Sequence, residues 1–127
     1  MVAIVKDSED GYRNHCSGTL INEQYVLTAA HCLDRVNPES LFLVFGSDDL
    51  RDDDQFYKLE REISQSFVHP KYNSQLHYYD LALLKMDSKL EYNAGILPIC
   101  LPKRAIINVD SRQNDGVTLT GYGSTSR

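Results

Sequence analysis

Short hydrophobic runs separated by polar turns dominate the chain. Three of these runs are Tyr25–Thr28, Leu41–Phe45 and Leu81–Leu84, and they are rich in Val, Leu, Phe and Tyr. Runs of four or five such residues between turn residues are typical of buried strands. The pattern therefore predicts an all-β domain, either a barrel or a sandwich.

Two turns extend this prediction. Asn22-Glu23-Gln24 separates Thr19–Ile21 from Tyr25–Thr28, which predicts a hairpin. Asn114-Asp115-Gly116 precedes Val117–Tyr122, so a further strand is expected there.

The stretch Gln55–Val68 fits two kinds of structure. Leu59, Ile63 and Phe67 have the i, i+4 spacing of a helix, but they also fit one face of a strand. The β-rich surroundings favour a strand.

Composition limits the classes of function. The 127 residues, 42% of them hydrophobic, have the size and make-up of one globular domain. A net charge of −5 argues against nucleic acid or an anionic membrane as the main partner. No hydrophobic run approaches the roughly 20 residues that span a bilayer. The five apolar residues before Lys6 are too few for a secretory signal core of about 7–15 residues.

His31 and Cys32 stand side by side just after the run Tyr25–Thr28. A zinc ligand pair, a disulfide beside a structural histidine, and a catalytic base anchored by a disulfide are three alternatives. No Cys-x-x-Cys pair occurs, so the common structural zinc spacings are absent. A disulfide between Cys16 and Cys32 would contribute about 3 kcal/mol and would imply an oxidising compartment. It would leave Cys100 without a partner in this chain.

Asp80 is the candidate for orienting an imidazole base. It precedes the hydrophobic run Leu81–Leu84, where a carboxylate is costly unless it is hydrogen-bonded or paired. The pKa of imidazole lies near neutrality, which suits His31 to general-base chemistry. A structural histidine and an ordinary turn aspartate remain the alternatives.

Four segments carry a family resemblance: CSGTLINEQYVLTAAHC, DLALLKM, LPICLP and TGYGSTSR, in this order along the chain. With them the chain resembles the N-terminal half of the catalytic domain of a trypsin/chymotrypsin-like serine protease. Its sequence is most similar in character to the arthropod clip-domain type. The resemblance implies a first six-stranded antiparallel barrel over residues 1–97. It also implies an inter-barrel connector over 98–116 and the first strand of a second barrel over 117–127.

The resemblance assigns roles to the candidate residues. It implies that His31 is the general base, that Asp80 orients it, and that a Cys16–Cys32 disulfide clamps the histidine turn. Cys100 matches the cysteine that joins such a domain to a propeptide or clip domain.

Two loops carry further assignments. His77 lies three residues before Asp80, where family loops line a substrate subsite, and a surface histidine is the alternative. Some family members bind calcium in the loop that here carries Asp48, Asp49, Asp52, Asp53 and Asp54. Ser47 replaces the first glutamate ligand of that site, so a solvated acidic loop is favoured over calcium, and no cofactor is expected. His15 is expected in a loop with no catalytic role.

The resemblance also shows what this sequence lacks. The family's nucleophilic serine lies in a Gly-Asp-Ser-Gly-Gly-Pro motif, which does not occur here. The oxyanion hole and the primary specificity pocket belong to the second barrel. We therefore expect a secreted, extracellular serine endopeptidase of which these 127 residues are an inactive fragment. Its expected partners are protein substrates and serpin-type inhibitors.

Two other functions stay open. A non-catalytic serine protease homologue, acting as a binding cofactor in an extracellular cascade, would keep His31 and Asp80 but lack the serine. A standalone barrel that serves as a binding module is disfavoured, because Val117–Tyr122 would be an unpaired edge strand.

Overall fold

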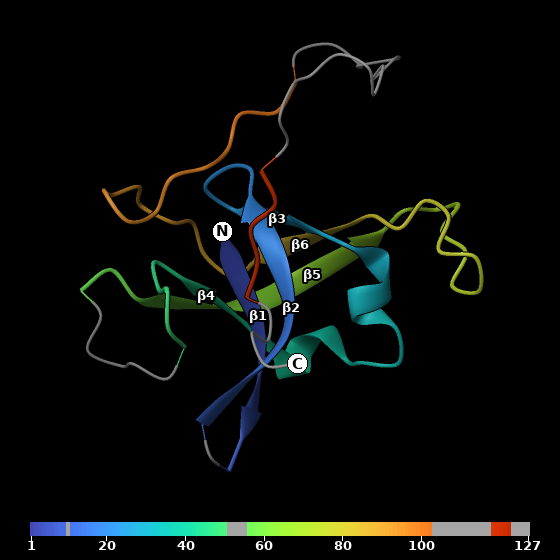
Figure 1. The fold of residues 1–127 in the computed structure, drawn as a ribbon, viewed down its shortest axis with the longest axis horizontal. Coiled ribbons are helices and arrows are strands. Elements are labelled where there is room, and N and C mark those ends of the chain that lie inside the picture. The colour runs from blue at the N-terminus through green and yellow to red at the C-terminus, as the bar shows by residue number, and fades with distance from the viewer. Residues whose placement is uncertain (10, 51–55, 103–117, 123–127) are drawn as a thin grey trace.

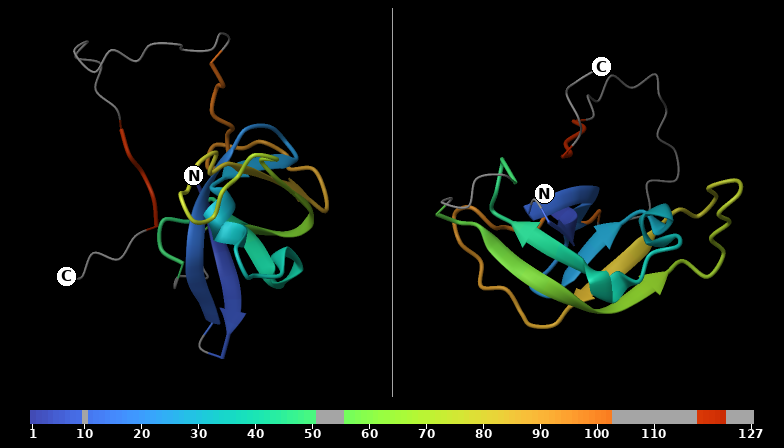
Figure 2. Two further views of the ribbon diagram at one scale, coloured as in Figure 1. Left: turned by 90° about the vertical axis from the view of Figure 1, so that its right-hand side faces the viewer. Right: turned by 90° about the horizontal axis from the view of Figure 1, so that it is seen from below.

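The computed structural model describes residues 1–9, 11–50, 56–102 and 118–122. In these residues six strands form a closed antiparallel barrel in the order β1-β2-β3-β6-β5-β4 (Figures 1 and 2). The strands are β1 Val2–Ser8, β2 Gly11–Leu20, β3 Tyr25–Thr28, β4 Leu41–Phe45, β5 Leu59–Val68 and β6 Ala82–Met86. Two short 3-10 helices, η1 Ala30–Leu33 and η2 Pro38–Ser40, lie between β3 and β4. The predicted all-β class and the six-stranded barrel are confirmed.

The hydrophobic runs predicted most of the strands. Leu41–Phe45 is β4, and the strand favoured within Gln55–Val68 is β5 rather than a helix. The predicted hairpin joins β2 to β3, with Leu20 paired with Val26. The run that begins at Leu81 forms β6, which starts one residue later.

The sequence pattern did not predict β1 or most of β2. Val2 and Ile4 of β1 belong to the barrel core, while Ala3 and Val5 pack outside it with Val44. All four residues of this β1 segment are fully buried. A strand covered on both faces has no polar alternation, so periodicity alone does not reveal it.

The strand expected over Val117–Tyr122 is not formed in residues 118–122, the part of it that is described. Side-chain contacts hold Tyr122 instead. Its backbone N–H donates to Ser17 Oγ at 3.1 Å, its carbonyl accepts from Asn14, and its hydroxyl donates to the carbonyl of Ser47. Residues 118–122 therefore rest on the barrel through these contacts and form no β-ladder with the described strands. Residues 103–117, which include most of the expected connector, lie outside the described residues.

Gly46 ends β4 at a position that only glycine fits. Its φ is +65°, and a Cβ placed there would lie 2.2 Å from the carbonyl oxygen of Tyr57. The chain can therefore turn away from the barrel while Tyr57, just before β5, approaches it closely. No helix in the described part of the chain is long and apolar enough to cross a bilayer.

The barrel core predicts a contrast between two phenylalanines. Phe45 is 1% exposed in the core and Phe56 is 90% exposed. Phe45→Ala should lower the free energy of unfolding by about 3–5 kcal/mol, since it removes a buried ring and leaves a cavity. The matched control Phe56→Ala should change it by less than about 0.5 kcal/mol. Chemical denaturation measures both, and similar losses in the two variants would contradict the assigned core.

Candidate active site

The pairing of β3 with β6 brings His31 and Asp80 together. These strands are antiparallel, and Thr28 at the end of β3 lies opposite Ala82 at the start of β6. His31 follows Thr28 by three residues, and Asp80 precedes Ala82 by two. Two residues 49 positions apart in the sequence therefore meet at one end of the barrel.

The local structure of η1 turns the His31 ring outward. Ala30 and Cys32, on either side of it, are buried at 1% and 4% exposure. The His31 side chain is 50% exposed. Two small buried neighbours anchor this short helix against the barrel, so the imidazole is the group presented to solvent.

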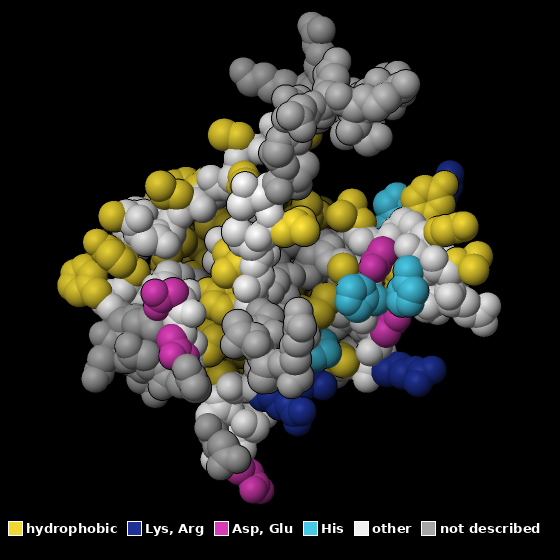
Figure 3. Space-filling view, viewed as in Figure 1, with side chains coloured by type: hydrophobic (Ala, Val, Ile, Leu, Met, Phe, Trp, Pro, Cys, Tyr) yellow, Lys and Arg dark blue, Asp and Glu magenta, His cyan; other side chains and the backbone are white. Residues whose placement is uncertain are grey.

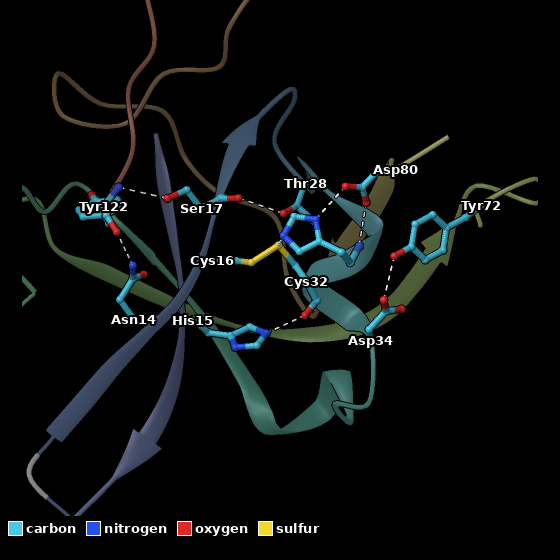
Figure 4. Close-up of a disulfide and its surroundings, with 11 residues drawn as sticks. Asn14, His15, Cys16, Ser17, Thr28, Cys32, Asp34, Tyr72, Asp80 and Tyr122 are labelled. Atoms are coloured by element: carbon cyan, nitrogen blue, oxygen red, sulfur yellow. Dashed lines mark hydrogen bonds and ion pairs between the residues drawn. A yellow bond between two sulfur atoms is a disulfide. The ribbon is translucent and has the colours of Figure 1, made fainter. Parts of the chain in front are cut away.

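A disulfide fixes this helix to β2. Cys16 and Cys32 are joined by a bond of 1.99 Å, as expected from the resemblance (Figure 4). Within the same region Thr28 Oγ1 donates to the carbonyl of Ser17 at 2.9 Å. The turn that carries His31 is thus held both by a covalent bond and by a buried hydroxyl.

His15 adds a contact that the sequence did not predict. It lies in β2 rather than in a loop, and its Nε2–H donates to the carbonyl oxygen of Cys32 at 2.7 Å. His15 therefore supports the backbone directly after His31. The only signal in the sequence was its place next to Cys16, which became informative once β2 was known to extend through both residues.

Asp80 holds His31 by two hydrogen bonds. One carboxylate oxygen accepts from the backbone N–H of His31 at 2.8 Å, and the other lies 2.7 Å from ring Nδ1. A carboxylate beside Nδ1 favours the neutral tautomer with the proton on Nδ1, so Nε2 has a free lone pair. The ring bond is the main reason that the pKa of Asp80 lies below its ordinary value of 3.8, and the backbone bond and the charges of His31 and His77 act in the same direction. This arrangement suits Nε2 to accept a proton.

The loop between β5 and β6 positions Asp80. It is tied to the end of η1 by the Tyr72 hydroxyl, which donates to Asp34 at 2.8 Å. Desolvation and this bond to Asp34 raise the pKa of Tyr72 to about 12, so the hydroxyl stays a donor at physiological pH. His69 stacks on Tyr79 with ring centroids 5.0 Å apart. These contacts fix both ends of the loop.

His77 lies beside the His31–Asp80 pair. Its ring meets the ring of His31 edge-on, with centroids 5.9 Å apart. Both His77 and Tyr79 have positive φ, +51° and +54°, which is uncommon for residues other than glycine. The loop therefore adopts a costly backbone conformation where it places His77 next to His31.

An open hollow of about 590 Å³ adjoins Asp80. Apolar side chains with large exposed fractions line part of it, among them Leu81 at 46%, Leu97 at 64% and Ile99 at 59%. Exposed apolar surface next to polar groups marks a site of interaction. Figure 3 shows such side chains on the same face as the histidine rings.

Comparisons with known proteins agree with this geometry. The trypsin family model matches residues 1–127. The chain belongs to the trypsin family. Among similar proteins, serine proteinase stubble of Drosophila melanogaster is 34% identical over 89% of this chain and 14% of its own length. Clotting factor G beta subunit of Tachypleus tridentatus is 34% identical over 100% of the chain and 40% of its own length. CLIP domain-containing serine protease C9 of Anopheles gambiae is 30% identical over 95% of this chain and 31% of its own length.

The chain thus spans less than half the length of these trypsin-family relatives. The homologues are serine proteases, which supports serine endopeptidase activity at the level of the family.

The remaining predicted residues lie away from the His31–Asp80 pair or outside the description. Cys100 is an exposed free thiol. Asp48 and Asp49 belong to none of the groups of potential metal ligands found among the described residues. Asp52, Asp53 and Asp54 lie outside the described residues, so the preference for a solvated acidic loop over a calcium site stays a prediction.

The bond between His31 and Asp80 predicts a measurable pKa change. In the wild type, the Asp80 carboxyl should titrate below 3.8, and in His31→Ala its pKa should rise because the ring hydrogen bond is lost. A lowered folded-state pKa stabilises the fold above the unfolded value, and this contribution disappears as the pH falls through the folded value. Carbon-13 NMR of the side-chain carboxyl measures both values.

An Asp80 pKa that does not change in His31→Ala would contradict the assigned hydrogen bond.

Proposed function

We propose that this chain contributes the general base and its orienting acid to a serine endopeptidase. The observation that carries the proposal is that Asp80 binds both the backbone N–H and Nδ1 of His31, which leaves Nε2 as the basic nitrogen of a side chain that is 50% exposed. In the reaction, Nε2 of His31 takes the proton of a serine hydroxyl as it attacks the scissile carbonyl. His31 then returns that proton to the leaving amine, while Asp80 stabilises the imidazolium and keeps its orientation.

The nucleophile comes from sequence beyond these 127 residues. No Gly-Asp-Ser-Gly-Gly-Pro motif occurs in the chain, and its relatives are more than twice as long. The hollow lined by Leu97 and Ile99 is the face on which we place a second barrel that carries the serine, the oxyanion hole and the specificity pocket. In this proposal residues 1–97 are the first barrel, 98–116 the connector and 117–127 the start of the second. The 127 residues alone do not hydrolyse peptides.

The proposed location of the protein is extracellular. The Cys16–Cys32 disulfide requires an oxidising compartment to form and persist. Protein substrates, with His77 lining one of their subsites, and serpin-type inhibitors are the partners that suit such an enzyme. A propeptide or clip domain joined through the exposed Cys100 is a further partner in this proposal.

Substitution of Asp80 tests the proposed mechanism in the longer protein that contains this chain. Asp80→Asn should lower kcat about 10⁴-fold, the loss typical of this change in a Ser-His-Asp triad, because the amide favours the wrong tautomer of the histidine. Asp87→Asn, at the opposite end of β6, should leave kcat unchanged. Hydrolysis of a peptide substrate measures both, and equal kcat values for the two variants would refute the assigned role of Asp80.

The second candidate function is a non-catalytic homologue that binds partners in an extracellular cascade. It is favoured only by the absence of a nucleophile motif from the 127 residues. A fluorophosphonate probe labels an activated serine. Labelling of the activated longer protein would support the enzyme, whereas no labelling together with no hydrolysis would support the homologue.

Cys100 gives a separate prediction. In the secreted longer protein, peptide mapping without reduction should find Cys16 linked to Cys32, and Cys100 linked to a cysteine outside residues 1–127. The first pair serves as the internal control for the preparation. Recovery of Cys100 as a free thiol would contradict the proposed tether.

A further inference from the structure

The pairing of β1 with β2 places two basic side chains opposite each other. Lys6 of β1 pairs directly with Arg13 of β2, so the two side chains lie on the same face of these strands. Like charges in directly opposite positions destabilise a strand pair. Neither side chain forms a hydrogen bond or an ion pair with a described residue. The fold therefore holds two neighbouring cations without a direct partner for either.

A hollow of about 310 Å³ opens beside this pair of cations. Lys6, Arg13, Asn14 and His15 line it, and among the described residues no carboxylate does. The whole chain has a net charge of −5, so a hollow with only basic and neutral polar side chains differs from the surface as a whole. In Figure 3, basic side chains lie beside a histidine at the lower centre of the view. This local excess of positive charge selects an anion.

The neutral side of the hollow is held by other contacts. Nε2–H of His15 donates to the carbonyl oxygen of Cys32 at 2.7 Å, and the Asn14 side chain donates to the carbonyl of Tyr122 (Figure 4). These two side chains therefore keep their positions without help from Lys6 or Arg13. A ligand in the hollow contacts a histidine that also supports the backbone directly after His31.

The two cations suit a doubly charged oxyanion. The planar guanidinium of Arg13 donates two parallel hydrogen bonds to the oxygens of a sulfate or phosphate, and the ammonium of Lys6 adds a point charge. A carboxylate would neutralise only one of the two cations, whereas a dianion neutralises both. Because the hollow presents one pair of cations, it fits a single group of this kind rather than a long polyanion.

A second polar hollow, of about 540 Å³, does not qualify. Asp34, Arg35, Ser74 and Gln75 line it, so its one cation is accompanied by a carboxylate. Asp34 already accepts a hydrogen bond from the Tyr72 hydroxyl at 2.8 Å. This lining carries no excess of either charge, and it selects neither an anion nor a cation.

We propose that Lys6 and Arg13 bind one tetrahedral dianion of the sulfate or phosphate class, with His15 as a wall of the site. The ion offsets the repulsion between the two opposed cations, so its binding stabilises the folded barrel. A free ion and a phosphate ester on a bound polypeptide present the same chemistry to this site. The site depends only on β1 and β2, and it goes beyond the proposed peptidase function without requiring it.

Calorimetric titration of the longer protein with sodium sulfate at low ionic strength tests the binding. The wild type should bind one sulfate, and Arg13→Gln should weaken the affinity about 10-fold or more because it removes the charged hydrogen bonds. The matched control is Lys89→Gln, since Lys89 already has a carboxylate partner, Glu23, at 3.1 Å; its affinity should equal that of the wild type. Sodium acetate should bind more weakly than sulfate. Equal sulfate affinities for the wild type and Arg13→Gln, equal affinities for acetate and sulfate, or no binding by the wild type would overturn the proposal.

Thermal unfolding without added sulfate gives a second, independent readout. Lys6→Met keeps the length of the aliphatic stem and removes the charge, so it should raise the Tm in low-salt buffer while it abolishes the increase that sulfate gives the wild type. A purely structural role of Lys6 would lower the Tm instead, and that result would contradict the proposal.

Titration with inorganic phosphate and with a phosphoserine peptide distinguishes the two sources of the dianion. Tighter binding of the peptide would identify an ester on a polypeptide as the ligand, and equal affinities would identify the free ion. The unphosphorylated peptide should not bind in either case. Arg13→Gln should weaken the binding of both ligands, and a phosphopeptide affinity that does not change in this variant would contradict the assigned site.

Discussion

The pairing of β3 with β6 is the contact on which both the fold and the site depend. These two strands are far apart in the sequence, and the closed barrel requires them to be neighbours. The register that pairs Thr28 with Ala82 also decides which residues meet just beyond the strand ends. A shift of one residue would turn the buried side chains of β6 outward and move Asp80 away from His31. Core packing therefore enforces the geometry of the polar pair.

The strand register places His31 near Asp80, and polar contacts then fix the turn and the loop that carry these two residues. The disulfide and the bond from His15 hold the backbone after His31, and the bond from Tyr72 to Asp34 ties the β5–β6 loop to the same turn. The imidazole has little conformational freedom left to lose in a reaction, because its orientation is fixed before any substrate binds. Supporting contacts of this kind separate an accurately held base from a histidine that is merely nearby.

The sequence revealed the parts of the molecule that depend on local pattern. The run Leu41–Phe45 reads as a strand because its neighbours in the chain are turns. β1 escaped detection because Val2–Val5 is buried on both faces, and that burial comes from elements distant in the sequence. The meeting of His31 with Asp80 was inferred from the family resemblance, since spacing alone gives no register. The role of His15 depends on the fold of η1 against β2, for which the sequence has no periodic signal.

The proposed base is assembled entirely by one barrel, and this has a chemical consequence. Its tautomer and orientation come from Asp80, a residue of the same barrel, so Nε2 presents its lone pair whether or not a serine is near. An exposed, correctly oriented lone pair is ready to accept a proton before any nucleophile approaches. Access to it then depends on whatever covers the open face beside Leu97 and Ile99.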